Sequence, residues 1–171
     1  MAEASEMGIS DYLRTRHIPF QTLLHEPATP ATKLARSVHV PGRHVAKAVL
    51  VKTETSYVLA VVPATHRIDL VRLGEVIDEP ALRLATEDEL ERVFNDCERG
   101  ALPPFGRLYG VQTVVDNSLT EGAEFVFEGN LRHEGVRMRF RDYEAIEAPL
   151  CASFATAIQP PRPRTSQRQA G

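Results

Sequence analysis

Residues 46–63, AKAVLVKTETSYVLAVVP, contain the two strongest strand signals in the chain. Residues 46–53 and 57–63 are apolar and rich in valine, and the polar residues 54–56 separate them. Short runs of β-branched residues on either side of a polar turn are typical of two antiparallel strands. We therefore expect a hairpin that is buried on both faces and lies within a larger sheet.

The segment before this hairpin predicts two short helices on either side of a strand. Apolar residues at helical spacing favour a helix over residues 5–16, and residues 20–25 read as a strand. A proline near the first turn of a helix costs no hydrogen bond, so residues 29–30 (TP) predict a second helix. Residues 41–42 (PG) would end it.

The segment after the hairpin predicts two capped helices and then a rigid loop. Asp69 begins a predicted helix through Ile77, and Thr86 and Glu89 have the spacing of a capping box. Residues 95–110 (NDCERGALPPFGRLYG) contain two adjacent prolines and three glycines, which favour an irregular loop.

The last third of the chain predicts short strands, one helix and a tail. The predicted elements are strands over residues 111–116, 124–128 and 136–140, a helix over 142–146, and a disordered basic tail over 159–171. Because helices and strands alternate and several strand pairs have short turns, the sequence favours an α+β domain. Its sheet would be mixed and largely antiparallel, with helices packed outside it.

The composition excludes several classes of protein. With 171 residues, 43% of them hydrophobic and 25% charged, the chain has the profile of one globular domain. A net charge of -3 argues against a protein that holds nucleic acid by general electrostatics, and no DNA partner is expected. There is no CxxC, no Cys/His cluster and no nucleotide-binding glycine motif, so we expect no metal and no cofactor. The absence of a signal peptide or a long apolar stretch predicts a cytoplasmic protein without a membrane partner.

Lys47 is the most informative single residue. Strand alternation puts Lys47, Val49 and Val51 on one face of the predicted hairpin. An amine at the start of an apolar run either extends outward to water or lines a cavity that receives an anion. The residues alone leave both interpretations open.

Two further features could contribute to a site. Glycines and prolines in residues 100–106 could hold backbone N–H groups as a rigid cradle for a carbonyl oxygen, or form only a stiff connection. Cys97 precedes this loop, but no histidine lies near it in sequence to activate a nucleophile. Arg137, Arg139 and Arg141 alternate with apolar residues, which is typical of a solvated face and would also suit a phosphate backbone.

Taken in order, these segments resemble the YbaK/ProX family of aminoacyl-tRNA editing domains, which also occur within bacterial prolyl-tRNA synthetases. The matching stretches are VAKAVLVK (45–52), YVLAVVPATHRIDL (57–70), FNDCERGALPPFG (94–106), FVFEGN (125–130) and RMRFRDYEAI (137–146). The resemblance covers about residues 18–148 of a domain that we place at 1–158. It implies a YbaK-like fold, in which the mixed sheet is curved or forms a partial barrel.

The resemblance also implies a function. Members of the family hydrolyse the ester of a mischarged tRNA, so we expect a free-standing deacylase that acts in trans. Its substrate would be a small amino acid such as alanine or cysteine on tRNAPro, bound at the 3′ acceptor end. A prolyl-tRNA synthetase is a second expected partner. The alternative is a non-catalytic module of the same fold that binds tRNA or a synthetase.

The family pattern assigns roles to residues of this chain. The strand lysine, Lys47, would hold the terminal nucleotide, and the glycine loop would surround the aminoacyl carbonyl. The loop residues are Gly100, Ala101, Leu102, Pro103, Pro104, Phe105 and Gly106, with Ala101 where some members have a second glycine. The other expected pocket residues are His25, Thr29, Gly129, Asn130 and His133, and the expected tRNA contacts are Arg137 and Arg139.

Overall fold

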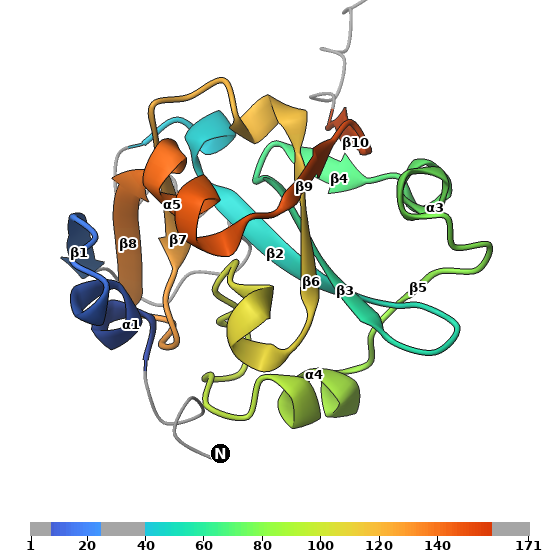
Figure 1. The fold of residues 1–171 in the computed structure, drawn as a ribbon, viewed down its shortest axis with the longest axis horizontal. Helices are drawn as coiled ribbons and strands as arrows, with labels where there is room; N and C mark the ends of the chain where they lie inside the picture. The colour runs from blue at the N-terminus through green and yellow to red at the C-terminus, as the bar shows by residue number, and fades with distance from the viewer. Residues whose placement is uncertain (1–7, 25–39, 159–171) are drawn as a thin grey trace, which may run out of the picture.

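The computed structural model describes residues 8–24 and 40–158 of the 171-residue chain (Figure 1). In chain order the elements are α1 (Ile9–Thr15), β1 (Phe20–Leu24), η2 (Gly42–His44), β2 (Ala46–Lys52), β3 (Tyr57–Pro63), β4 (His66–Ile68), α3 (Leu70–Ile77), β5 (Arg83–Leu84), α4 (Glu87–Val93), η3 (Gly106–Tyr109), β6 (Gln112–Asp116), η4 (Asn117–Leu119), β7 (Glu124–Glu128), β8 (Glu134–Arg139), α5 (Phe140–Glu147), β9 (Leu150–Ala152) and β10 (Ala155–Ala157). The predicted helix that opens at residues 29–30 and the predicted tail lie outside the described residues.

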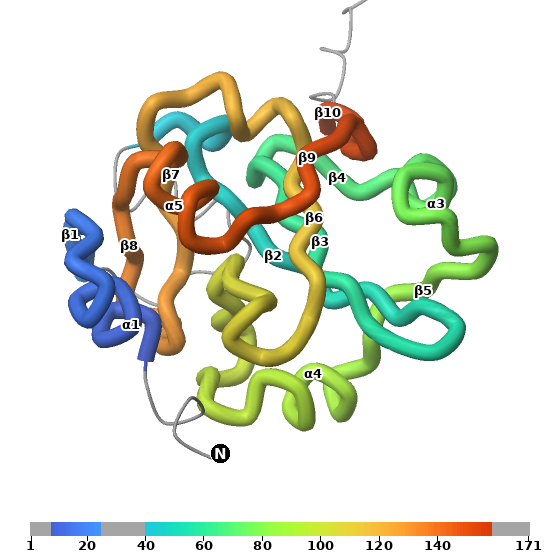
Figure 2. The backbone as a smooth tube through the Cα atoms, in the orientation of Figure 1, coloured from blue at the N-terminus to red at the C-terminus, as the bar shows by residue number. Residues whose placement is uncertain are grey.

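The strands form three sheets that do not close into a barrel. The central sheet has the order β5-β2-β3-β6-β9, in which β6 runs parallel to both of its neighbours. A second sheet, β1-β8-β7, and the β10-β4 pair are antiparallel. An isolated parallel bridge from Val45 to Val126 brings β7 beside the start of β2 (Figure 2). The prediction of an α+β fold with a mixed, largely antiparallel sheet is confirmed.

The hairpin that dominates the sequence is the centre of the main sheet. Its antiparallel register runs from Ala46 opposite Pro63 to Lys52 opposite Tyr57, as predicted. Strand β3 is buried at every position after Tyr57, because β2 and β6 flank it. The prediction of burial on both faces is wrong for the first half of β2, where residues 47–49 are only half-buried. Strand β5 pairs with β2 only at Val51 and Lys52, so the edge before them is open to other parts of the protein.

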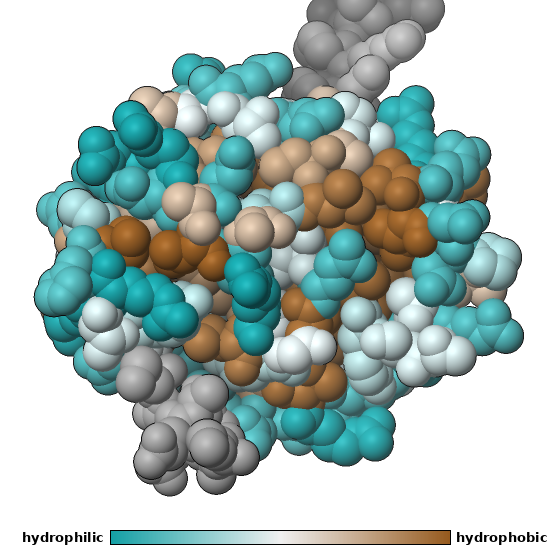
Figure 3. Space-filling model, in the orientation of Figure 1, coloured by the Kyte–Doolittle hydropathy of each residue, from teal (hydrophilic) through white to brown (hydrophobic). Residues whose placement is uncertain are grey.

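The hairpin separates two hydrophobic clusters. One lies between the central sheet and the β1-β8-β7 sheet and contains an aromatic group in which Phe105 is 5.1 Å from Tyr143 and 5.5 Å from Phe127, between ring centroids. The other packs Val51, Val58, Ala60, Val62, Val114 and Phe154 under Leu73 of α3. Figure 3 shows apolar side chains at the surface between β9 and α3. Alternate residues of one hairpin therefore support two cores.

The local signals for helices are confirmed. The Asp69 carboxylate accepts hydrogen bonds from the backbone N–H groups of Val71 and Arg72 at 3.1 and 3.2 Å. Thr86 and Glu89 form the predicted capping box at the start of α4. Both caps satisfy N–H groups that a helix leaves without internal acceptors.

The boundaries differ from the prediction in the second half of the chain. Strand β8 ends at Arg139 and α5 begins at Phe140, so Arg141 lies on a helix and not on the strand with Arg137 and Arg139. The loop over residues 95–110 contains one 3-10 turn at Gly106–Tyr109. Strands β4, β5, β9 and β10 were not predicted, since two or three residues are too few to show a strand pattern.

Candidate functional site

The glycine–proline loop is fixed by its second half. Phe105 is fully buried among the aromatic rings, and the Tyr143 hydroxyl donates to the Pro104 carbonyl at 2.6 Å. The Gly106 N–H donates to Thr113 Oγ1 at 3.0 Å, and Thr113 donates in turn to Glu147 at 2.7 Å. The loop is therefore attached to both β6 and α5.

The first half of the loop has two backbone N–H groups that could donate to a bound molecule. Ala101 N–H donates to the Glu98 carbonyl and Phe105 N–H to the Pro103 carbonyl, each at 2.9 Å. Prolines have no N–H. Within the described residues, the N–H groups of Gly100 and Leu102 have no acceptor. Gly100 has a φ of +89°, a conformation that favours glycine, so this geometry depends on the residue type.

A small pocket lies beside these two residues. Its volume is about 160 Å³, and Ala48, Leu90, Phe94, Cys97, Ala101 and Leu102 give it an apolar wall. Glu87, Glu91, Glu98 and Arg99 stand around it as charged groups. An apolar cavity of this size suits a small side chain.

Cys97 lines the pocket as a neutral thiol. Burial raises its pKa to about 12, with Asp96 adding to the effect. The Tyr109 hydroxyl lies 3.5 Å from the Cys97 Sγ and donates to Asp96 at 2.7 Å. A thiol that stays protonated near neutral pH is a poor nucleophile, so this environment is typical of a structural cysteine.

Asn130 connects the pocket to α1. Its side-chain oxygen accepts from the Ile9 N–H at 2.7 Å, and its amide donates to Tyr109 at 3.3 Å. Its backbone carbonyl accepts from the Glu98 N–H at 2.8 Å. These bonds use the polar groups of Asn130 to hold the loop. Gly129 is buried beside it, and His133 is exposed on the following turn.

Lys47 lies on β2 as predicted, half-buried, and burial lowers the pKa of its amine. Its side chain is on the opposite face of the strand from Ala48, which lines the pocket. No acceptor for its ammonium group lies in the described residues. Such a group is able to bind an anion or a carbonyl oxygen that enters from outside.

Glu128 is a titratable residue of this region that sequence reasoning missed. Burial raises the pKa of its carboxyl to about 7, an effect that Arg132 opposes and Glu98 adds to. The Arg132 side chain packs over Gly100, since a Cβ at that glycine would lie 3.5 Å from Arg132 Nε. A glutamate that directly follows the apolar run FVF (125–127) and precedes Gly129 was the signal that could have identified it.

Arg137 and Arg139 share the outer face of β8. Arg139 pairs with Asp142 at 3.0 Å, and Arg137 lies 3.5 Å from Gln21 Oε1. Together with His44 they line a groove of about 640 Å³. Both guanidinium groups are thus held at one surface groove. His25 and Thr29 lie outside the described residues.

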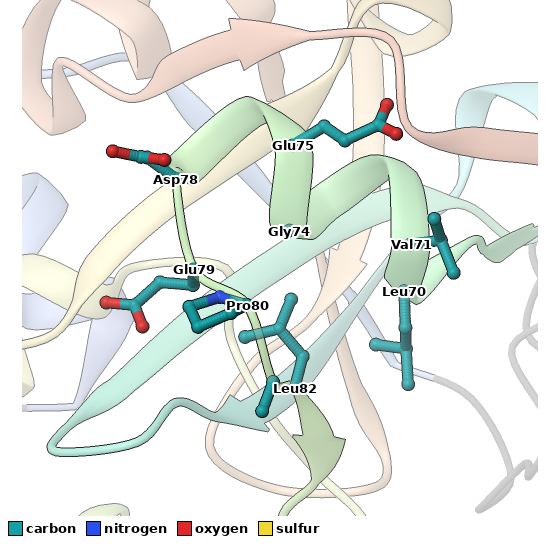
Figure 4. Close-up of a pocket in the computed structure, with 9 residues that line it drawn as sticks. Leu70, Val71, Gly74, Glu75, Asp78, Glu79, Pro80 and Leu82 are labelled. Atoms are coloured by element: carbon teal, nitrogen blue, oxygen red, sulfur yellow. The ribbon is translucent and has the colours of Figure 1, made fainter.

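Another groove, of about 650 Å³, lies beneath α3 and contains none of the residues predicted from the sequence. Figure 4 shows Leu70, Pro80 and Leu82 beneath the helix and the carboxylates of Asp78 and Glu79 near its C-terminal end. Its acidic groups would repel a polyanion. In the described part of the chain, no three His, Cys, Asp or Glu side chains are grouped to hold a metal, and no helix could span a membrane.

Comparisons with known proteins identify relatives of this chain. The chain is 31% identical over 112 residues to the proline–tRNA ligase of Xanthomonas oryzae pv. oryzae, a match covering 63% of this chain and 20% of that enzyme. It is 32% identical over 100 residues to the proline–tRNA ligase of Geobacillus thermodenitrificans, covering 56% of this chain and 18% of that enzyme. The chain thus spans about a fifth of the length of these curated relatives.

Solved structures share the fold. One is a candidate trans-editing enzyme for prolyl tRNA synthetase, with a TM-score of 0.77, 20% identity, and coverage of 92% of this chain and 99% of that one. The model of the aminoacyl-tRNA editing domain matches residues 25–146, most of the sequence. On this match, which contains the strand of Lys47, the glycine–proline loop and the turn of Asn130, the chain belongs to the aminoacyl-tRNA editing domain family.

Proposed function

We propose that this domain hydrolyses the ester bond between a wrongly attached amino acid and the 3′ end of a tRNA. The proposed substrate is a small amino acid, alanine or cysteine, on tRNAPro. One observation carries the proposal: the rigid loop leaves the N–H groups of Gly100 and Leu102 without acceptors beside a small apolar pocket. Membership of the editing family supports the same reaction.

The two N–H groups would bind the ester carbonyl oxygen. Water attacks the carbonyl carbon, negative charge builds on the oxygen, and preorganised donors stabilise that charge. The bond between the carbonyl carbon and the ribose oxygen then breaks, and the ribose oxygen takes a proton. The products are the free amino acid and the uncharged tRNA. An aminoacyl ester is already reactive, so a positioned water and a polarised carbonyl are sufficient for hydrolysis. The 2′-hydroxyl or the amine of the substrate would help to activate that water.

Charged groups would position the tRNA. The Lys47 ammonium would bind the terminal phosphate or ribose, because it is half-buried and has no acceptor among the described residues. Arg137 and Arg139 would contact phosphates of the acceptor stem from their groove on β8. Because the domain has a net negative charge, it does not attract tRNA by general electrostatics. These few contacts would instead orient the bound tRNA.

Pocket size supports a small side chain. The pocket of about 160 Å³ beside Gly100 is bounded by the buried Phe94 ring and the partly buried Leu90 side chain. Its wall could not shift for a larger side chain without opening the contact between Phe94 and Tyr109, whose ring centroids are 4.3 Å apart. We propose that this wall rejects large residues.

The test measures deacylation of Ala-tRNAPro, Cys-tRNAPro, Ser-tRNA and correctly charged Pro-tRNAPro. We expect the first or second to be hydrolysed and Pro-tRNAPro to be spared. Lys47→Ala should abolish the reaction. Lys52→Ala is the matched control, because Lys52 ends the same strand and, among the described residues, its amine contacts Ser56 O and the Tyr57 ring. Full activity of Lys47→Ala would refute the role of this lysine.

The same experiment tests the alternative of a module that binds tRNA or a prolyl-tRNA synthetase without catalysis. Binding of charged tRNA with no loss of any ester would favour that alternative. Loss of one ester in the wild type, and not in Lys47→Ala, would establish editing and identify the amino acid.

A further inference from the structure

A cluster of four hydrogen-bonded side chains adjoins the small pocket beside Gly100. Its members are Asp96, Cys97, Tyr109 and Asn130. The Tyr109 hydroxyl donates to the Asp96 carboxylate at 2.7 Å and accepts from the Asn130 amide at 3.3 Å. The Cys97 Sγ lies 3.5 Å from that hydroxyl, and it also contacts Asp96 at 3.4 Å and Asn130 Nδ2 at 3.5 Å. The Tyr109 hydroxyl thus contacts each of the other three side chains.

The cluster stands between two pockets of different character. Cys97 lines the small, mainly apolar pocket of about 160 Å³. Its partners Asp96 and Asn130 line a second, polar pocket of about 420 Å³. If Cys97 moved, the small pocket could therefore extend toward the polar one. The hydrogen bonds that hold Cys97 fix this side of the small pocket.

Tyr109 supports a second part of the same wall. Its ring packs against the ring of Phe94 with 4.3 Å between the centroids, and the buried Phe94 lines the small pocket. Tyr109 itself is not among the residues that line this pocket. It is the last residue of η3, in the glycine–proline loop. One side chain behind the wall therefore holds Cys97 through its hydroxyl and Phe94 through its ring.

We propose that Tyr109 is a positioning residue that sets the size limit of the amino-acid pocket by holding Cys97 and Phe94 in place. This inference rests on the proposed function. The two contributions of the side chain can be separated, because phenylalanine at this position keeps the ring against Phe94 and lacks the hydroxyl. Cys97 would then lose one of its three partners. A wall that is no longer fixed at Cys97 would admit a larger side chain.

Both hydroxyl and thiol keep their protons near neutral pH. Burial raises the pKa of the Tyr109 hydroxyl, and its hydrogen bonds with Cys97 and Asp96 add to this effect. Burial also raises the pKa of the Cys97 thiol to about 12. The hydroxyl therefore remains a donor to Asp96, and the thiol presents an uncharged surface to the pocket.

The test compares kcat/KM for two esters within each variant. One is whichever of Ala-tRNAPro and Cys-tRNAPro the wild type hydrolyses faster, and the other is Val-tRNAPro, whose side chain is larger. The wild type should prefer the small ester by about 100-fold, in the range that added methyl groups cost in an apolar pocket. Tyr109→Phe should lower this preference by about 10-fold, through faster hydrolysis of the valine ester.

Tyr57→Phe is the matched control. The Tyr57 hydroxyl donates to the Glu89 carboxylate at 2.7 Å, as the Tyr109 hydroxyl does to Asp96, and neither Tyr57 nor Glu89 lines the small pocket. Both variants lose a hydrogen bond to a carboxylate, so urea unfolding should show a lower stability for each. Tyr57→Phe should nevertheless keep the full preference for the small ester.

A second variant tests whether the hydroxyl acts through Cys97. Cys97→Ala removes the Sγ from the pocket wall and should lower the preference by itself. In the double variant, Tyr109→Phe should then have little further effect, because coupled residues are not additive. Effects that simply multiply would show that the hydroxyl does not act through Cys97, and the inference would be wrong.

The remaining outcomes separate this inference from the proposed function. If the wild type hydrolyses a small ester and Tyr109→Phe keeps the full preference, the inference is wrong and the editing activity stands. The same holds if Tyr57→Phe loses as much of the preference, or if the wild type hydrolyses the valine ester equally well. If the wild type hydrolyses none of the esters, the proposed function fails and the inference fails with it.

Discussion

Gly106→Ala adds a methyl group where the protein has no room for one. A Cβ at Gly106 would lie 2.5 Å from the Val111 carbonyl oxygen and 2.6 Å from Thr113 Oγ1. Neither atom is free to move, because the Val111 N–H donates to the Gly106 carbonyl at 2.9 Å and Thr113 bonds both Gly106 and Glu147. We therefore expect the loop, and with it the N–H groups of Gly100 and Leu102, to shift.

The cost follows from two contributions. Overpacking of a filled interior costs about 1–3 kcal/mol. Loss of the Gly106–Thr113 hydrogen bond adds about 1 kcal/mol. The free energy of unfolding should fall by about 2–4 kcal/mol, which for a domain of this size lowers Tm by roughly 4–16 °C. Urea unfolding followed by circular dichroism measures this change through the midpoint.

Two other glycines serve as controls. Gly8→Ala has only an ordinary contact at 3.7 Å and a φ of -58°, so it should change stability by less than about 0.5 kcal/mol. Gly110→Ala has open space but a φ of +71°, so strain alone should cost about 1–2 kcal/mol. If Gly106→Ala unfolds at the same urea concentration as Gly8→Ala, the described packing of the loop is wrong.

Three further changes test the electrostatics of the fold. Glu147→Ala should lower the free energy of unfolding by about 2–3 kcal/mol, because buried donors such as the Thr113 hydroxyl lose their acceptor. Glu147→Gln keeps an acceptor oxygen, so equal urea midpoints for the two variants would contradict this. The folded-state pKa of Glu128, about 7 against a usual 4.5, means that the folded protein binds this proton more tightly. The free energy of unfolding should therefore fall as pH rises from 4.5 to 7, by roughly 1–3 kcal/mol once screening of the carboxylate by water is included. Urea unfolding at pH 5 and pH 8 measures this difference, and Glu128→Gln should remove it. The Arg83 guanidinium holds the pKa of Glu89 well below its usual range, so the stability that Glu89 provides should be lost as pH falls below about 4.5. Glu89→Gln should unfold with a weaker dependence on acid than the wild type; an unchanged dependence would refute this.

Local patterns in the sequence predicted the elements that carry their own signals. The hairpin of residues 46–63 is visible because two valine-rich runs meet at a polar turn, and the observed register follows from that turn. The caps at Asp69 and Thr86 are visible because a capping side chain bonds a backbone group only two or three residues away. The glycine–proline loop and the alternation of Arg137 and Arg139 are local in the same way.

The tertiary structure decided which of these features meet. The Ala101 N–H donates to the Glu98 carbonyl, and the Glu98 N–H donates in turn to the carbonyl of Asn130, far along the chain. Val126 becomes a neighbour of Val45 only because β7 reaches the start of β2. The two-residue strand β5 exists only where β2 accepts its hydrogen bonds. Sequence periodicity determines the conformation and exposed face of a segment by itself, because these depend on nearby residues. Partners distant in sequence, burial and the pKa of a buried carboxyl depend on the packing of the whole domain, so only the folded chain determines them.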